Sequence, residues 1–202
     1  YTLIDDLVFT SNGGGGHTLQ RINEDLSWTE LDGVDISLNA RQGVLIGNVV
    51  YASNYEHGIT AYNISARNLS IINHYGPAGA EFFDVVTDST YIYAADRTQG
   101  LYVYEIISPG VLSQVEHVSG YNPDYLALDD TYLYAYSSGG QGISVHTRES
   151  DGTLTFVDNN TEEINAVEII SDGTNIYMAE GTGGIHVFRM NASNELEKLD
   201  SV

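Results

Sequence analysis

Acidic and histidine side chains that could do chemistry occur throughout this chain, but none stands in the spacing of a known catalytic motif. Asp84, Asp129 and Glu168 fall at or near the first strands of repeated units, where they could serve as the acid and base of a glycosidase. That reaction needs two carboxylates about 5 to 9.5 Å apart, in a pocket that inserted loops usually build. The connections here are short, and no Ser has a nucleophile elbow, so we expect no enzyme.

Metal and phosphate chemistry is equally weakly supported. Three histidines could share a metal ion, but they lack the close second ligand of a zinc site: His57, His74 and His117. The run Gly13 to Gly16 lacks the Lys and the helix of a phosphate loop. Asp-rich turns such as Asp129–Asp130 and Ser171–Gly173 could bind Ca²⁺, although most such turns bind no ion. We therefore expect no cofactor, with Ca²⁺ at these turns as the alternative.

Charge and composition limit the classes of binding partner and the cellular location that we expect. The 202 residues contain 28 acidic and 7 basic side chains, for a net charge of −21, and a single lysine. Such a surface repels nucleic acid, and no stretch is apolar enough to span a membrane. The sequence begins inside a repeat, without Met, which we interpret as a removed leader and an extracellular or cell-surface location. Four candidate N-glycosylation sequons agree with export: Asn63, Asn68, Asn159 and Asn191.

The chain is organised by an internal repeat. A glycine that precedes an alternating strand recurs at a constant step of 42 residues, at Gly16, Gly58, Gly100, Gly142 and Gly184. Each unit reads as a short apolar strand, a tight turn, a strand with an aromatic residue, a Gly-rich connection, an alternating strand, a polar turn and a fourth strand. Apolar residues recur with period 2 rather than 3.6, which favours strands over helical repeats of similar length.

Four short strands per repeat of this length are typical of a β-propeller blade. We therefore predict an all-β, five-bladed β-propeller in one domain over residues 1–202, with four antiparallel strands per blade and no strand exchanged between the chain ends. The expected blades cover residues 1–42, 43–84, 85–126, 127–168 and 169–202.

The repeat also resembles a known family. The pattern Y-x-Y-A-A-x(4)-G-L-x-V-x-x-I around residues 91–106 is similar to the LVIVD-type propeller repeat of bacterial and archaeal surface and secreted proteins. The likeness is clearest from Val49 to Met190, but the Asn-Pro that the family places after the third strand is absent. The resemblance implies a propeller fold and an extracellular tendency, and it implies no reaction.

Aligning the units places one aromatic residue of the second strand in every blade: Phe9, Tyr51, Tyr93, Tyr134 and Tyr177. Aromatic residues at positions fixed by a repeat usually pack between sheets, so we interpret this column as core.

The connections and return loops are expected at one end of the sheets, where they form a rim rich in Tyr, His and acidic residues. The residues of this rim are Tyr55, Glu56, His57, His74, Tyr75, Asp96, Arg97, His117, Tyr121, Asp124, Tyr125, Glu162, Glu163 and Glu180. Tyr is favoured in contact surfaces. We single out six candidates for assembly contacts: Tyr55, His57, His74, Tyr75, Tyr121 and Tyr125. The leading hypothesis is an exported, non-enzymatic subunit that self-assembles into a filament or surface layer. The alternative is a lectin-like propeller that binds glycans at several sites.

Overall fold

The described chain consists of strands and turns. The computed structural model describes residues 2–4, 7–34, 39–65, 68–162 and 165–201, and no helix occurs among them. The described residues therefore include no helix long and apolar enough to cross a membrane. The all-β class predicted from the period-2 alternation is confirmed.

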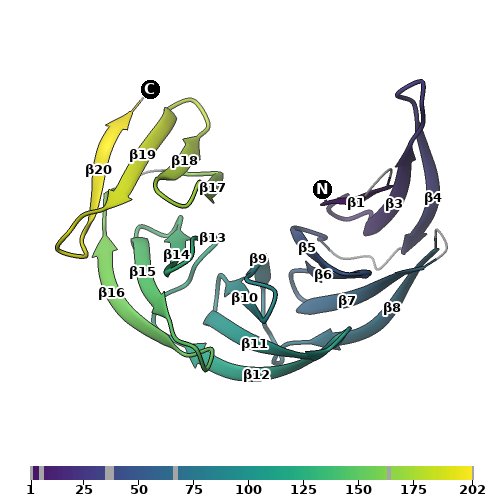
Figure 1. The fold of residues 1–202 in the computed structure, drawn as a ribbon, viewed down its shortest axis with the longest axis horizontal. Coiled ribbons are helices and arrows are strands. Elements are labelled where there is room, and N and C mark those ends of the chain that lie inside the picture. Colours follow the sequence, from purple (N-terminus) through teal and green to yellow (C-terminus); the bar gives the residue numbers. More distant parts are fainter. Residues whose placement is uncertain (1, 5–6, 35–38, 66–67, 163–164, 202) are drawn as a thin grey trace. The chain divides into compact units, whose positions relative to one another are not determined.

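The described residues form five sheets of four strands, and each sheet is built from four consecutive strands (Figure 1). In the first, second, fourth and fifth of these sheets neighbouring strands run antiparallel. The predicted unit of four antiparallel strands is confirmed for the part of the chain that the structure describes.

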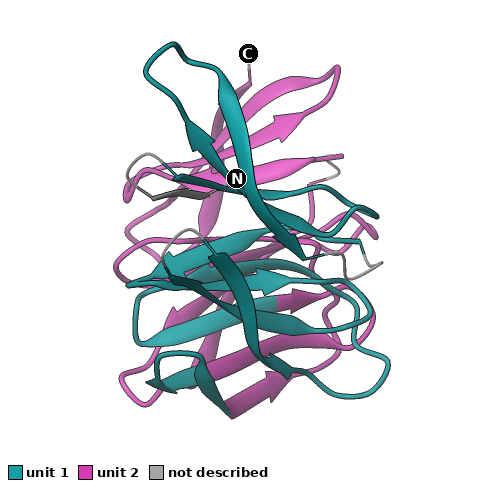
Figure 2. Ribbon diagram, turned by 90° about the vertical axis from the view of Figure 1, so that its right-hand side faces the viewer, with its two compact units in different colours: residues 1–94, 105–113 teal, residues 95–104, 114–202 magenta. Residues whose placement is uncertain are grey.

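The chain divides into two compact units (Figure 2). Unit 1 comprises residues 1–94 and 105–113, and unit 2 comprises residues 95–104 and 114–202. Two sheets lie wholly in unit 1, formed by β1 (Thr2–Ile4), β2 (Leu7–Ser11), β3 (His17–Ile22) and β4 (Trp28–Val34), and by β5 (Gly43–Ile46), β6 (Val49–Ser53), β7 (Ile59–Ser65) and β8 (Asn68–Tyr75).

The sheet of β9 (Phe82–Thr87), β10 (Tyr91–Asp96), β11 (Gly100–Ser108) and β12 (Val111–Val118) contributes residues to both units. Two more sheets lie wholly in unit 2, formed by β13 (Tyr125–Leu128), β14 (Tyr132–Ser137), β15 (Gly142–Arg148) and β16 (Leu154–Asn160), and by β17 (Glu168–Ser171), β18 (Ile176–Glu180), β19 (Gly184–Met190) and β20 (Leu196–Ser201).

The glycine that marks the repeat is required by the backbone. Gly58 and Gly142 have φ values of +73° and +76°, which side chains rarely tolerate. A Cβ at either position would lie 2.0 Å from a carbonyl oxygen of the outer strand, that of Tyr75 or of Asn160. The outer strand therefore passes too close for any other residue.

A β-bulge also recurs with the repeat. The register between the third and fourth strands shifts between Leu19 and Gln20, and it shifts again after Ala61, Val145 and Val187. Bulges bend and twist the bulged strand, so the long outer hairpins share one curvature.

Adjacent sheets pack through apolar faces within each unit. In unit 1, Phe9 and Leu19 pack against Val50, Ala52 and Tyr62 of the next sheet. In unit 2, the corresponding core joins the sheet of β13–β16 to the sheet of β17–β20. Its buried residues are Ala127, Tyr134, Tyr136, Ile143, Val145, Ala166, Ile169, Ile176, Met178, Phe188 and Leu196.

A hydrogen bond from a backbone N–H to a carboxylate, which we call the polar tie, joins the outer strands of neighbouring sheets. The N–H of Leu69 donates to Asp32 at 2.8 Å in unit 1, and in unit 2 the N–H groups of Leu154 and Leu196 donate to Glu116 at 2.6 Å and to Asp158 at 2.7 Å. The three acceptors stand at multiples of 42 residues, so the tie belongs to the repeat.

Candidate functional site

In successive repeats, the connection between the second and third strands contacts the return loop that leads to the next repeat. In unit 1 this contact is an isolated backbone bridge, between Gly13 and Ala40 and again between Tyr55 and Phe82. The two residues of each pair are 27 positions apart, and the second pair lies 42 residues after the first. Counting 42 residues further along the sequence from Tyr55 and Phe82 gives Arg97 and Asp124, both of which belong to unit 2.

Arg97 and Asp124 form an ion pair at this position. Nε and Nη2 of Arg97 lie 2.7 Å and 2.5 Å from Oδ1 of Asp124, and Oδ2 of Asp124 accepts the N–H of Ser138 at 2.6 Å. Asp124 is 2% exposed. A buried carboxylate with these partners holds the guanidinium in one place. In the next repeat Val167 takes the place of Asp124, since its N–H bonds to the Ala179 carbonyl as that of Asp124 bonds to Tyr136, so the charged pair does not recur there.

The ion pair borders a hollow of about 370 Å³ in unit 2. Its walls come from three loops and carry mostly amide and hydroxyl groups: Arg97, Asn122, Asp124, Ser137, Ser138, Gly139 and Gln141. The loop of Asn122 is fixed to the β14–β15 connection, because its N–H donates to the Gln141 side chain at 3.0 Å. This lining suits a small polyhydroxylated molecule.

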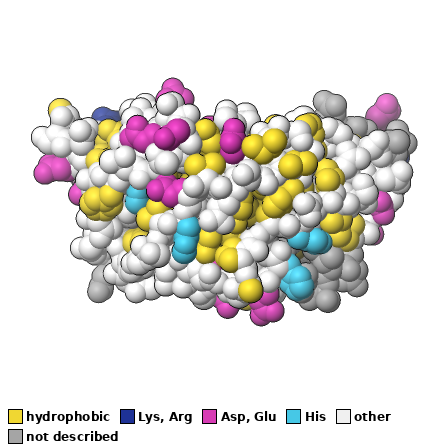
Figure 3. Space-filling model, turned by 90° about the horizontal axis from the view of Figure 1, so that it is seen from below, with side chains coloured by type: hydrophobic (Ala, Val, Ile, Leu, Met, Phe, Trp, Pro, Cys, Tyr) yellow, Lys and Arg dark blue, Asp and Glu magenta, His cyan; other side chains and the backbone are white. Residues whose placement is uncertain are grey.

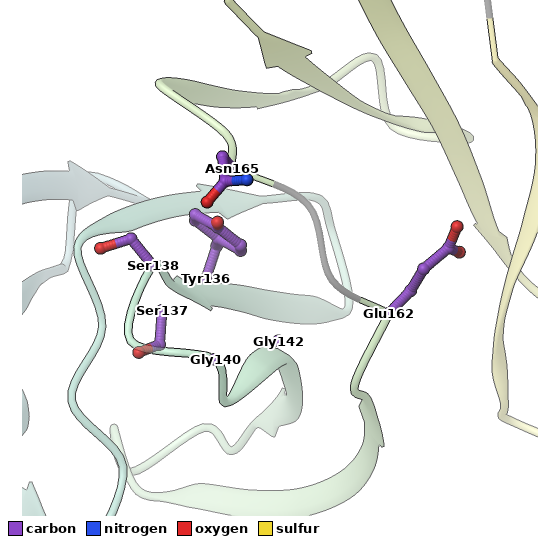
Figure 4. Close-up of a pocket in the computed structure, with 7 residues that line it drawn as sticks. All are labelled: Tyr136, Ser137, Ser138, Gly140, Gly142, Glu162 and Asn165. Atoms are coloured by element: carbon purple, nitrogen blue, oxygen red, sulfur yellow. The ribbon is translucent and has the colours of Figure 1, made fainter. Parts of the chain in front are cut away.

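A second hollow of about 130 Å³ adjoins the first, since Ser137 and Ser138 line both. Figure 4 shows the β14–β15 connection on one side, and Glu162 and Asn165 from the loop between β16 and β17 on the other. Tyr136 lies at its base, and its hydroxyl accepts the N–H of Ala166 at 3.1 Å. We call these two hollows together the double hollow.

Hydrogen bonds from β18 and β19 support the second hollow. Glu180 accepts the N–H of Asn165 at 3.1 Å through one oxygen, and its other oxygen lies 2.8 Å from Nε2 of His186. These bonds lower the pKa of Glu180, first through the Asn165 N–H and then through His186. Glu162, which lines the hollow, forms an ion pair with Lys198, the single lysine of the chain.

Charged side chains of both signs line the double hollow. Within its described lining, Arg97 is the cation, while Asp124 and Glu162 are the carboxylates. Asp124 accepts bonds from Arg97 and Ser138, and Glu162 is paired with Lys198. Figure 3 shows scattered acidic side chains among hydrophobic and other side chains on one face of the molecule, and hardly any Lys or Arg.

The structure gives most of the six predicted contact residues internal partners. In unit 1 the hydroxyl of Tyr75 donates to the Gly110 carbonyl at 2.7 Å, and His74 lies 2.9 Å from the Thr60 hydroxyl. Tyr55 takes part in the bridge to Phe82, whereas His57 is exposed. In unit 2 Tyr121 places its hydroxyl 2.6 Å from the Ala135 carbonyl oxygen. Tyr125 is half-buried and stacks on Tyr136. A role in contacts with a second copy or a glycan stays a prediction.

The repeated aromatic residues are buried at Phe9, Tyr51, Tyr93 and Tyr134 and half-buried at Tyr177. Of the four sequons, Asn63, Asn68 and Asn159 lie in β7, β8 and β16, and Asn191 caps the β19–β20 turn. Glu163 lies outside the described residues. No three His, Asp or Glu side chains among the described residues are placed to share a metal ion. Glycosylation and Ca²⁺ binding stay predictions.

Comparison with known proteins identifies the fold and a family. The family model described as "Lactonase, 7-bladed beta-propeller" matches residues 87–202. Comparison with curated proteins gave no significant match. A solved protein from Bacteroides fragilis assigned as a 6-phosphogluconolactonase superposes with a TM-score of 0.84 at 17% identity, over 98% of this chain and 68% of that one. The periplasmic gluconolactonase PpgL of Pseudomonas aeruginosa superposes with a TM-score of 0.81 at 16% identity, over 98% and 67%.

At such identities the structural likeness shows the propeller fold alone, and the family match carries the functional information. These findings correct the prediction of a non-enzymatic filament or surface-layer subunit, together with its lectin-like alternative, because the matching family is named for a lactonase. The prediction of no enzyme is likewise wrong. The resemblance to LVIVD-type repeats led to the right fold, but that family is not the one that matches.

Proposed function

Because the chain belongs to the Lactonase, 7-bladed β-propeller family, we propose that it hydrolyses the cyclic ester of a sugar lactone at the double hollow of unit 2. The observation that carries this assignment is the ion pair of Arg97 and Asp124. It places a fixed guanidinium beside a hydroxyl- and amide-lined hollow, at a position where the preceding repeats have Gly–Ala and Tyr–Phe.

The chemistry requires a water molecule to attack the lactone carbonyl carbon. In the proposed mechanism Glu162 takes a proton from that water, and Arg97 stabilises the negative charge that develops on the carbonyl oxygen. The bond between the carbonyl carbon and the ring oxygen then breaks. The ring oxygen leaves as a hydroxyl after receiving the proton, and the product is the open hydroxy acid. Ser137, Ser138 and Gln141 would hold the sugar hydroxyls.

The substrate class follows from the similar structures. One of them is a periplasmic gluconolactonase and another is assigned as a 6-phosphogluconolactonase, so δ-gluconolactone and its 6-phosphate are the first compounds to test. The periplasmic relative also supports the predicted export of this chain.

The decisive experiment follows ring opening of both lactones, with the spontaneous rate subtracted. Glu162→Gln should lower kcat by about 10²-fold or more, which is typical for loss of a positioned base. Glu197→Gln is the matched control, since Glu197 is exposed on β20 and lies outside the described lining of the double hollow. No rate above background with either lactone would refute the assignment.

The number of blades is part of the proposal. The family description names seven blades, and the described chain has five sheets. One face of the last sheet is exposed where its equivalents are buried: Ile185 is 49% exposed against 2% for Ile143, and Ile170 is 57% exposed against 4% for Ala127. Asp200 also occupies the position of the acceptors Glu116 and Asp158.

We propose that the five sheets are blades of a seven-bladed ring, and that a further sheet of the same repeat covers this face. The ring of five blades predicted from the sequence is the competing arrangement. Intact mass of the native protein separates them, because a five-bladed ring requires only this chain of 22.0 kDa. A native mass of that size with Ile185 shielded from solvent would favour five blades.

A further inference from the structure

Asp96, the last residue of β10, is a buried carboxylate that turns back onto its own chain. It is 0% exposed. Its Oδ1 accepts three bonds, from the N–H of Thr98 at 2.9 Å, from the Thr98 hydroxyl at 2.9 Å and from the N–H of Gln99 at 3.0 Å. Its Oδ2 is buried and has no hydrogen-bond partner in the described part of the chain.

The preceding repeat uses this position differently. Asn54 stands 42 residues earlier in unit 1, and both ends of its amide are bonded. Its Nδ2 donates to the Thr60 hydroxyl at 2.6 Å, and its Oδ1 lies 2.5 Å from Nε2 of His17. Leaving a buried polar atom unbonded is unfavourable, and more so for a charged group. Aspartate at position 96 is therefore not explained by stability.

The segment that Asp96 fixes is the connection that carries Arg97. Arg97 lies between Asp96 and Thr98, which are bonded to each other. Gln99 is fixed further, because its side chain accepts the Tyr102 hydroxyl at 3.1 Å and its carbonyl oxygen lies 2.8 Å from Nε2 of His117. The backbone on the C-terminal side of Arg97 is thus held at several points, and all these residues belong to unit 2.

We infer that Asp96 is a positioning residue for Arg97: it fixes the 97–99 connection so that the guanidinium meets both Asp124 and the substrate. The inference rests on the proposed role of Arg97 in lactone hydrolysis. What matters is the acceptor oxygen and not the negative charge. A misplacement of a reacting group by about 1 Å can lower a rate about 10²-fold, so a modest loosening of this connection is enough to be measured.

Two variants at this position separate geometry from charge. Asp96→Ala removes the acceptor, so amide exchange of Thr98 and Gln99 should become at least about tenfold faster. The same variant should lower kcat about tenfold with little change in KM, because the contact strengthens in the transition state. Asp96→Asn keeps an acceptor oxygen and has the amide that Asn54 has at the same repeat position, so it should restore both exchange protection and kcat.

Asp172→Ala is the matched control. Asp172 builds the same kind of turn, with the N–H groups of Thr174 and Asn175 at 2.8 Å and 2.7 Å, and it lies outside the described lining of the double hollow. It should loosen its own turn and leave kcat unchanged. Unchanged exchange in Asp96→Ala, or an unchanged kcat despite faster exchange, would overturn the inference. An inactive Asp96→Asn with normal exchange would also overturn it. If the wild-type protein opens no lactone, the proposed function fails, while exchange still tests whether Asp96 fixes the connection.

Discussion

The hydroxyl of Tyr134 donates a hydrogen bond of 2.7 Å to Oδ2 of Asp129, the residue that turns the chain between β13 and β14. The same bond joins Tyr93 to Asp88 at 2.9 Å and Tyr177 to Asp172 at 2.7 Å. The other oxygen of each Asp accepts N–H groups of the turn, such as those of Thr131 and Tyr132. The repeated tyrosine therefore packs its ring in the sheet and ties down the turn with its hydroxyl.

Removing this hydroxyl should destabilise the fold. Tyr134→Phe leaves Oδ2 of the half-buried Asp129 without this donor, and we expect the free energy of unfolding to fall by about 1–2 kcal/mol in a urea titration. Tyr132→Phe is the control, since that hydroxyl bonds to Asn194 at an exposed site and should matter little. Equal effects of the two variants would contradict the role given to Asp129.

Buried tyrosines should make the protein sensitive to alkali. Burial raises the pKa of Tyr62 to about 12, and it also raises the pKa of Tyr134. Because these folded-state pKa values lie above the unfolded value of about 10, their contribution is complete below pH 10 and is lost as the pH rises through the folded values. Unfolding free energy measured at rising pH should fall above about pH 10, and Tyr62→Phe should flatten this fall.

Two buried histidines should make it sensitive to acid. Burial lowers the pKa of His17 and of His146 to about 4 from 6.5. The unfolded chain therefore binds more protons between pH 6.5 and 4, so stability is lost as the pH falls through that window, by about 3 kcal/mol for each histidine. His146→Phe, which introduces the residue found at position 188 one repeat later, should remove about half of this dependence. An unchanged slope would show that the pKa of His146 is the same in the folded and unfolded chain, contrary to this account.

The polar ties between outer strands should stabilise the packing of sheets. Asp158→Ala removes the acceptor for the Leu196 N–H and should lower unfolding free energy by about 1.5–3 kcal/mol. Asp200→Ala is the matched control, because Asp200 has the same repeat position but is exposed and accepts the N–H of its neighbour Ser201. A loss of similar size in both variants would show that the tie between sheets is not the cause.

The repeat could be predicted from the sequence because backbone geometry enforces it. Gly58 and Gly142 must lack a Cβ, and the alternation around Val103 and Val145 places one face in a core, so period and strand order were visible in the residues. Strand ends were less certain: β9 begins at Phe82, which also forms the isolated bridge to Tyr55.

The site could not be predicted in the same way. Arg97, Asp124 and Glu162 were visible as rim residues, but no motif marks an arginine whose partner lies 27 residues away. The available signal was the break in the repeat, where Gly–Ala and Tyr–Phe become Arg–Asp. The abundance of tyrosine suggested a contact surface instead, because the internal partners of the hydroxyl groups of Tyr75, Tyr121 and Tyr134 appear only in three dimensions.

The central claim is that Arg97 serves lactone hydrolysis, and ring opening of δ-gluconolactone and its 6-phosphate by three proteins tests it most directly. Wild type should open at least one of them, and Arg97→Ala should lower its kcat about 10²- to 10³-fold, the range for loss of one oxyanion-stabilising donor. Arg189→Ala should match wild type, because Arg189 bonds to Asn175 and lies outside the described lining of the double hollow. Undiminished hydrolysis by Arg97→Ala, or equal losses in both variants, would contradict the account.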